Sequence, residues 1–72
     1  MEKLLTKEEK ENLPLDLTWE WTEKADEFTY RVEAFDKKTN TLYTGYCDIG
    51  EYNILDWRWA DRNDDIYAKI LN

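Results

Sequence analysis

Carboxylates are the side chains that this sequence offers in sufficient number for chemistry. The chain of 72 residues has 17 acidic residues, 10 basic residues and no histidine, so its formal net charge is −7. Two carboxylates in one pocket can serve as an acid and a base when their surroundings separate their pKa values. A chain this short has little room for such a pocket. We therefore predict that the protein is not an enzyme and has no catalytic residue.

The single cysteine, Cys47, is the other reactive group. A thiol needs a neighbouring base to become a catalytic nucleophile, and the chain has no histidine to supply one. Two glycines are too few for a glycine-rich phosphate loop. Cys47 lies in an apolar stretch, which predicts a small core residue. A lone thiol and the absence of an apolar leader at residues 1–10 predict a cytoplasmic protein, and no apolar run is long enough for a membrane span.

Residues 61–65, DRNDD, have the spacing of a calcium-binding loop. Asp61, Asn63 and Asp65 would supply the oxygens of its first, third and fifth positions. Ile66 stands where the loop requires glycine, and Asn72 stands where it requires glutamate. We predict no metal and no cofactor, and these three residues are weak calcium candidates.

The acidic residues gather at two turns that we expect to be equivalent. Lysine and arginine supply most of the affinity for nucleic acid, so a chain of this charge is not expected to bind it directly. The field of such a surface attracts a basic protein instead. The predicted partner-binding residues are Glu20, Glu23, Asp26, Glu27, Asp56, Asp61, Asp64 and Asp65.

Alternation of apolar and polar residues predicts the elements that hold these carboxylates. Period two indicates half-buried strands, and it occurs at residues 15–22, 28–35 and 53–60. Residues 41–49 also predict a strand, but with apolar groups on both faces, which indicates a central strand or a bulge or bend at Gly45. Residues 36–40 form a turn in which Asn40 adopts a positive φ angle. The residues predicted to face the core include Leu15, Leu17, Trp19, Trp21, Phe28, Tyr30, Val32 and Ala34.

A repeat bears on the last element. LTWEW at residues 17–21 returns as LDWRW at residues 55–59, and the similarity extends over residues 17–32 and 55–70. Two similar hairpins would close one core between their tryptophans and make the tail a strand. The same tail also reads as a helix over residues 64–71, capped by Asn63. We prefer the strand and keep the helix as the alternative.

The first residues predict a short helix. TKEE at residues 6–9 has the pattern of a capping box, and the helix runs to about Asn12 before Pro14. The domain plan is an N-terminal helix or arm at residues 1–14 and a single antiparallel β domain at residues 15–72. The predicted fold is mainly β, a small antiparallel sheet or open barrel of about five strands with a short N-terminal helix. The alternative is α+β with the C-terminal helix.

These features favour a small acidic binding module that docks on a basic, nucleic-acid-binding protein and inhibits it. Small phage inhibitors that mimic nucleic acid offer an analogy of size and charge only. One alternative is a ligand- or calcium-binding module that uses exposed aromatic residues or the loop at residues 61–65. Another is a structural or self-associating subunit. A monomer and a homodimer are both compatible with the sequence.

Overall fold

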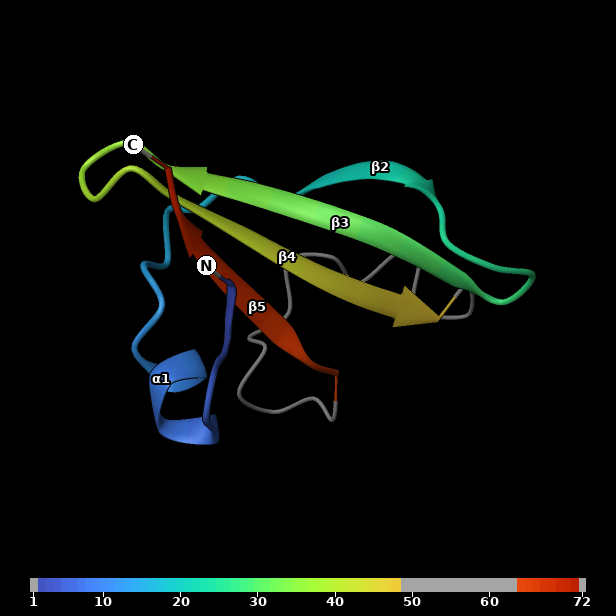
Figure 1. Cartoon of the computed structure of the whole chain (residues 1–72), viewed down its shortest axis with the longest axis horizontal. Coiled ribbons are helices and arrows are strands. Elements are labelled where there is room, and N and C mark those ends of the chain that lie inside the picture. The colour runs from blue at the N-terminus through green and yellow to red at the C-terminus, as the bar shows by residue number, and fades with distance from the viewer. Residues whose placement is uncertain (1, 49–63, 72) are drawn as a thin grey trace.

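The computed structural model describes residues 2–48 and 64–71, which form one open antiparallel sheet (Figure 1). The sheet has five strands in the order β1-β5-β4-β3-β2, and the described residues contain one short helix, α1. The predicted mainly β class is confirmed. The strands are β1 (Glu2–Leu4), β2 (Glu20–Lys24), β3 (Thr29–Asp36), β4 (Thr41–Asp48) and β5 (Ile66–Ile70), and the helix is α1 (Lys7–Glu11).

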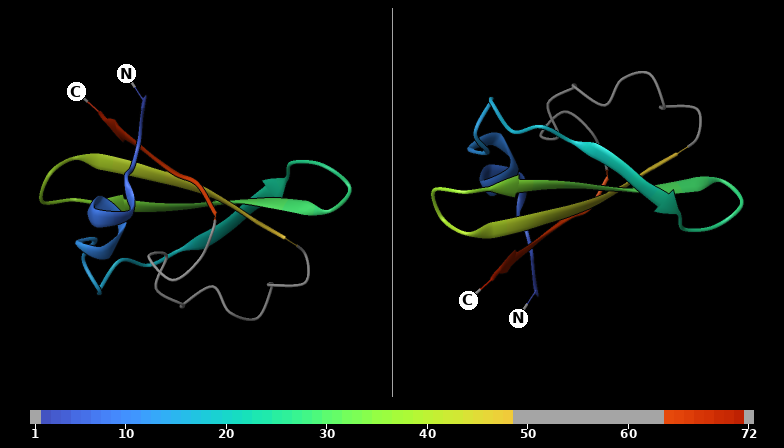
Figure 2. Two further views of the ribbon diagram at one scale, coloured as in Figure 1. Left: turned by 90° about the horizontal axis from the view of Figure 1, so that it is seen from below. Right: turned by 90° about the horizontal axis from the view of Figure 1, so that it is seen from above.

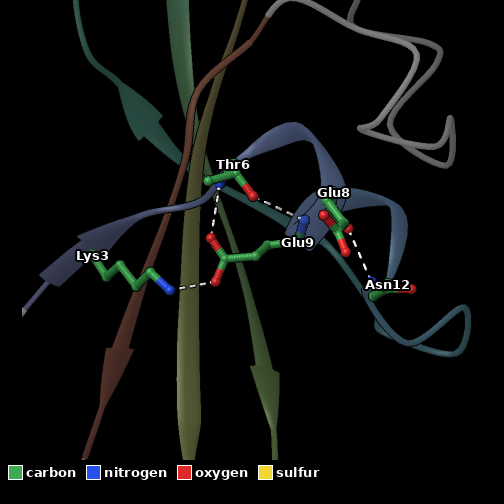
Figure 3. A network of polar contacts seen from close by, with 5 residues as sticks. All are labelled: Lys3, Thr6, Glu8, Glu9 and Asn12. Atoms are coloured by element: carbon green, nitrogen blue, oxygen red, sulfur yellow. Dashed lines mark hydrogen bonds and ion pairs between the residues drawn. The ribbon is translucent and has the colours of Figure 1, made fainter.

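The predicted capping box begins α1 (Figure 3). The Glu9 amide donates to the Thr6 hydroxyl oxygen at 3.2 Å, and the Glu9 carboxylate accepts from the Thr6 amide at 2.9 Å. Lys3 of β1 donates to the other oxygen of the same carboxylate. Asn12 ends the helix, where its side-chain amide donates to the carbonyl of Glu8 at 3.1 Å. A helix of five residues has too few internal bonds to stand alone, so these caps and contacts hold it.

The N-terminal segment contributes a strand as well as the predicted helix. Its strand β1 is antiparallel to β5, with Glu2 opposite Lys69 and Leu4 opposite Tyr67. A segment of three residues is too short for its alternation of apolar and polar residues to predict a strand. The ammonium of Lys10 in α1 donates to the backbone carbonyl of Asp64 at 2.9 Å, which ties the helix to the start of β5. The N-terminal segment therefore joins the sheet through β1, and α1 contacts the residues just before β5.

β3 and β4 agree with the predicted strands at residues 28–35 and 41–49. They pair along their whole length, from Thr29 opposite Asp48 to Asp36 opposite Thr41. Asn40 takes a φ of 54° in the turn, as predicted. The Asp36 carboxylate accepts from the amide of Lys38 at 3.0 Å and fixes the first half of this turn.

The strand predicted at residues 15–22 is shorter and lies later, because β2 begins at Glu20. A bulge interrupts its pairing with β3 between Trp21 and Glu23. Leu17, Trp19 and Trp21 are half-buried as predicted, whereas Leu15 is 84% exposed. The alternation thus reports which side chains face the core, although the chain in front of Glu20 is not a strand.

Phe28 also departs from the prediction that it faces the core. Its side chain is 68% exposed. Its amide donates to the carboxylate of Asp26 at 2.8 Å, which makes the residues before β3 a turn. β3 therefore starts one residue later than predicted, and Phe28 leaves the alternating face.

The tail is a strand, as preferred, and the alternative helix at residues 64–71 is wrong. The arrangement of two similar hairpins is also wrong over β5. This strand has β4 on one edge and β1 on the other, so no edge is left for a hairpin partner beside residues 67–69. The strand predicted at residues 53–60, with Trp57 and Trp59, lies outside the described residues.

The core lies on one face of the sheet, on the side of α1 (Figure 2). Val32, Cys47 and Ile66 are fully buried there, which confirms the prediction for Cys47. Gly45 stands between Val32 and Ile66 in the register, and its lack of a side chain leaves room for both. Half-buried residues surround this centre: Leu5, Leu13, Trp19, Trp21 and Tyr43. Large rings suit a small core, because each buries about 150–250 Å².

Candidate acidic surface and strand-edge groove

Three of the predicted acidic residues that the structure describes lie together at one end of the sheet. Glu23, Asp26 and Glu27 are exposed around the β2–β3 turn. Thr29 is opposite Asp48 in the register, so this turn and the end of β4 share that end, whereas β5 begins opposite Gly45, near the middle of β4 (Figure 1). We call the shared end the acidic end; its carboxylates are Glu23, Asp26, Glu27 and Asp48.

Local contacts orient several of these carboxylates. Glu23 forms an ion pair with Arg31 at 3.2 Å, and the Arg31 Nε donates to the Thr22 hydroxyl oxygen at 3.1 Å. Asp26 holds the turn through the amide of Phe28. The amide of Ala25 donates to the carbonyl of Thr29 at 2.8 Å, which closes the same turn. The acidic end is therefore a fixed surface on this side.

The second predicted cluster is only partly described. Asp64 is half-buried and Asp65 is exposed, and both lie just before β5, away from the acidic end. Asp56, Asp61 and Asn63 lie outside the described residues, so the calcium loop stays an untested hypothesis. Within residues 2–48 and 64–71, no three carboxylate or thiol groups come together in a way that would hold a metal ion.

Glu20 also lies away from the acidic end. It begins β2 and is directly opposite Glu33 of β3. Like charges in directly opposite positions of a sheet repel each other. This pair lies at the edge of a groove of about 470 Å³, which the sequence did not predict.

The groove exists because the chain in front of β2 leaves the edge of β3. β2 pairs with β3 only from Glu20 onward, and residues 16–19 run away from the neighbouring strand (Figures 1 and 2). The last residues of β3, 34–36, keep β4 on one edge and have no described strand on the other. The groove lies between the two segments; its lining residues are Asp16, Leu17, Thr18, Glu20, Glu33, Ala34, Phe35, Asp36, Lys37 and Lys38.

The face of the sheet opposite the core adds apolar surface next to the groove. No described element covers this face (Figure 2). Phe35 is 43% exposed and Tyr46 is 38% exposed on it, and the register places Leu42 and Tyr67 on the same side. Partly exposed rings beside carboxylates make a surface that can contact both the apolar stems and the charged heads of lysine or arginine.

Comparison with known proteins assigns no family or function to this chain. The described helix is far too short to cross a membrane. No protein-family model, no curated protein and no solved structure matches this chain.

Proposed function

We propose that the chain is a small acidic binding module that docks on a basic protein and inhibits it. The observation that supports this proposal is the acidic end, where the carboxylates of the β2–β3 turn and of the last residue of β4 share one end of the sheet. A surface of one sign steers a partner of the opposite sign and speeds its association. The proposal places the protein in the cytoplasm, in keeping with its buried lone thiol.

The class of partner follows from the chemistry of the surface. Carboxylates held by a hairpin present negative charge at fixed positions, as phosphates do along a nucleic acid. Lysine and arginine side chains that grip phosphate are able to pair with carboxylates as well. We therefore propose a nucleic-acid-binding protein as the partner. Inhibition follows from competition, because the module and the nucleic acid would occupy the same basic groove.

Self-association is the second candidate function. The specific observation in its favour is the uncovered sheet face with the exposed rings of Phe35 and Tyr46. Apolar patches that stay exposed on small proteins often mark interfaces. Sedimentation across a concentration series distinguishes the candidates, because a self-associating subunit gains mass without any partner.

The test of the leading proposal is binding across a salt series. The immobilised protein captures partners from a bacterial lysate at low salt, and surface plasmon resonance then measures the purified partner between low and high salt. Exposed charges are screened over about 8 Å at physiological ionic strength, so the association rate and the affinity should fall as salt rises. Labelled nucleic acid bound to the partner should be released as the module is added.

Matched variants locate the surface. The test variant E23Q/D26N/E27Q removes three charges at the acidic end, and its D26N change keeps a side-chain oxygen for the Phe28 amide. The control variant E2Q/E8Q/E11Q changes the net charge equally, at exposed positions of β1 and α1. The test variant should bind more weakly than the control while both stay folded. Salt-independent binding with equal affinities would show that the carboxylates only solvate the protein.

A further inference from the structure

We propose that the groove beside β3 binds an extended segment of the partner, rich in lysine or arginine, as an added strand. This inference rests on the proposed function for the sign of the partner's charge. It adds a second site, a binding mode and the conformation of the bound segment. Three observations support it: an open strand edge, a groove along this edge, and the repulsive pair of carboxylates, Glu20 and Glu33, in the lining of the groove.

The open edge supplies the backbone groups for strand addition. A strand pairs through alternate residues on each edge, and the carbonyl of Arg31 faces β2, since it accepts from the Thr22 hydroxyl at 3.0 Å. Phe35 is four residues further along the same strand, so its amide and carbonyl face the side of β2 as well. β2 does not reach Phe35, because its first residue, Glu20, is opposite Glu33, and no described strand pairs with β3 beyond that point. An extended segment in the groove would therefore pair with the Phe35 amide and carbonyl, in line with β2 along the same edge of β3.

The lining charges determine the chemistry of the segment. The groove has four carboxylates and two ammonium groups, and its apolar lining comes from Leu17, Ala34 and Phe35. Glu20 and Glu33 stand directly opposite each other, where like charges destabilise a sheet. A lysine or arginine between them would replace repulsion by two attractions. The occupant is therefore a basic segment with apolar residues in alternation.

A second copy of the chain fits this groove less well. Edge-to-edge pairing of two molecules through β3 would bring two sets of the same carboxylates together. The net charge of −7 on each molecule adds to that repulsion. The structure thus favours a basic partner over a second copy as the occupant.

The first experiment follows the backbone amides of the labelled protein by nuclear magnetic resonance. The probe is the peptide acetyl-KVKVKVK-amide, and the control peptide is acetyl-EVEVEVE-amide. The basic peptide should shift the amide signals of residues 33–38 and slow the hydrogen exchange of the Phe35 amide at least several-fold. The acidic peptide should do neither. A basic peptide that shifts only the signals of residues 23–27 would overturn the groove proposal and leave the acidic end as the docking surface.

Methylated peptides test the strand addition itself. Strand pairing uses every second amide of the added segment. One probe is N-methylated at its valines and another at its lysines, so each loses one set of donors. One of the two should bind at least tenfold more weakly than the other. Equal affinities would show that side chains alone hold the peptide and that no strand is added.

Protein variants separate this proposal from the function on which it rests. Glu33→Gln should raise or preserve the melting temperature, since it removes the repulsion with Glu20, and should weaken binding of the basic peptide several-fold. Glu27→Gln has the same charge change outside the groove and should leave peptide binding close to wild type. Equal weakening by both variants would contradict the groove, whereas no salt dependence for the natural partner would contradict the proposed function. Groove signals that shift with protein concentration alone would identify a second copy as the occupant.

Discussion

Three fully buried side chains hold the described part of the core together: Val32, Cys47 and Ile66. They come from β3, β4 and β5, which are consecutive in the sheet, so their packing joins these three strands. A domain of this size has a free energy of unfolding of only about 5 kcal/mol or somewhat more. Each of these residues is therefore a large part of the total stability.

Two isoleucines of β5 provide a matched test of that statement. Ile66 is fully buried and Ile70 is 61% exposed, although both point to the same face of the same strand. Ile66→Ala should lower the free energy of unfolding by about 2–5 kcal/mol, because it leaves a cavity. Ile70→Ala should cost less than about 1 kcal/mol. Urea unfolding followed by tryptophan fluorescence gives both values, and similar values would mean that Ile66 is not central to the core.

Glu9 makes stability depend on pH. The hydrogen bond from Lys3 is the main cause that lowers the pKa of Glu9 below its ordinary value of 4.5, and the Thr6 amide adds to it. A lowered pKa in the folded state gives stability that is complete above the ordinary value and is lost as pH falls through the folded value. Glu9→Gln keeps an oxygen for the Thr6 amide and loses the charge. The variant should show a smaller loss of melting temperature between pH 6 and pH 3 than the wild type; identical profiles would contradict the assignment.

At the scale of elements, the capping box is the feature that makes α1 a helix. Thr6→Ala removes the acceptor of the Glu9 amide and should cost about 0.5–2 kcal/mol of local stability. Thr6→Ser keeps a hydroxyl and should behave nearly as the wild type. Hydrogen exchange of the Glu9 amide measures the effect, which should be faster exchange in the alanine variant. Unchanged exchange would show that the contacts with β1 and β5 hold the helix without its cap.

The elements with strong local signals were predictable. The capping box, the apolar patterns of β3 and β4 and the turn at Asn40 all depend on neighbours in the chain. The strand at residues 66–70 was preferred because of the repeat, since its own residues fit a helix as well. β1 was not predictable, because three residues have no period of their own and their partner lies at the other end of the sequence. The second hairpin failed for a similar reason. Similarity between two segments does not say which strands occupy the edges of β5.

The candidate site was predictable in part. The acidic residues at the β2–β3 turn follow from a hairpin between two alternating stretches, and the structure places them on exposed positions. The groove was not predictable, because alternation continues through residues 16–19 although the chain leaves β3 there. Because Leu17 and Trp19 are half-buried, the same alternation arises whether residues 16–19 pair as a strand or leave the sheet. Only the register of β2, which starts at Glu20, exposes the edge of β3.

At the scale of the whole molecule, β1 protects an edge of the sheet. Removal of residues 1–4 would leave one edge of β5 without its partner. Exposed strand edges pair with other chains. The truncated protein should therefore unfold at a lower urea concentration than the wild type. In sedimentation experiments its average molecular mass should rise with protein concentration, because truncated molecules associate. The control variant E2A/L4A keeps the main chain of β1, so its molecular mass in solution should stay closer to that of the wild type. Equal association of the truncated protein and the control would show that side chains, not backbone pairing, protect the edge.

The position of β5 between β1 and β4 also sets an order of events during synthesis on the ribosome. The hairpins that join β2, β3 and β4 are local and are able to form while the chain is still growing. Until β5 is synthesised, one edge of β4 has no partner strand, and β1 also lacks the strand with which it pairs. Ile66 reaches Val32 and Cys47 only when the final strand emerges. We therefore expect the sheet to close after its last residues leave the exit tunnel, so that the nascent chain carries an unpaired strand edge until then.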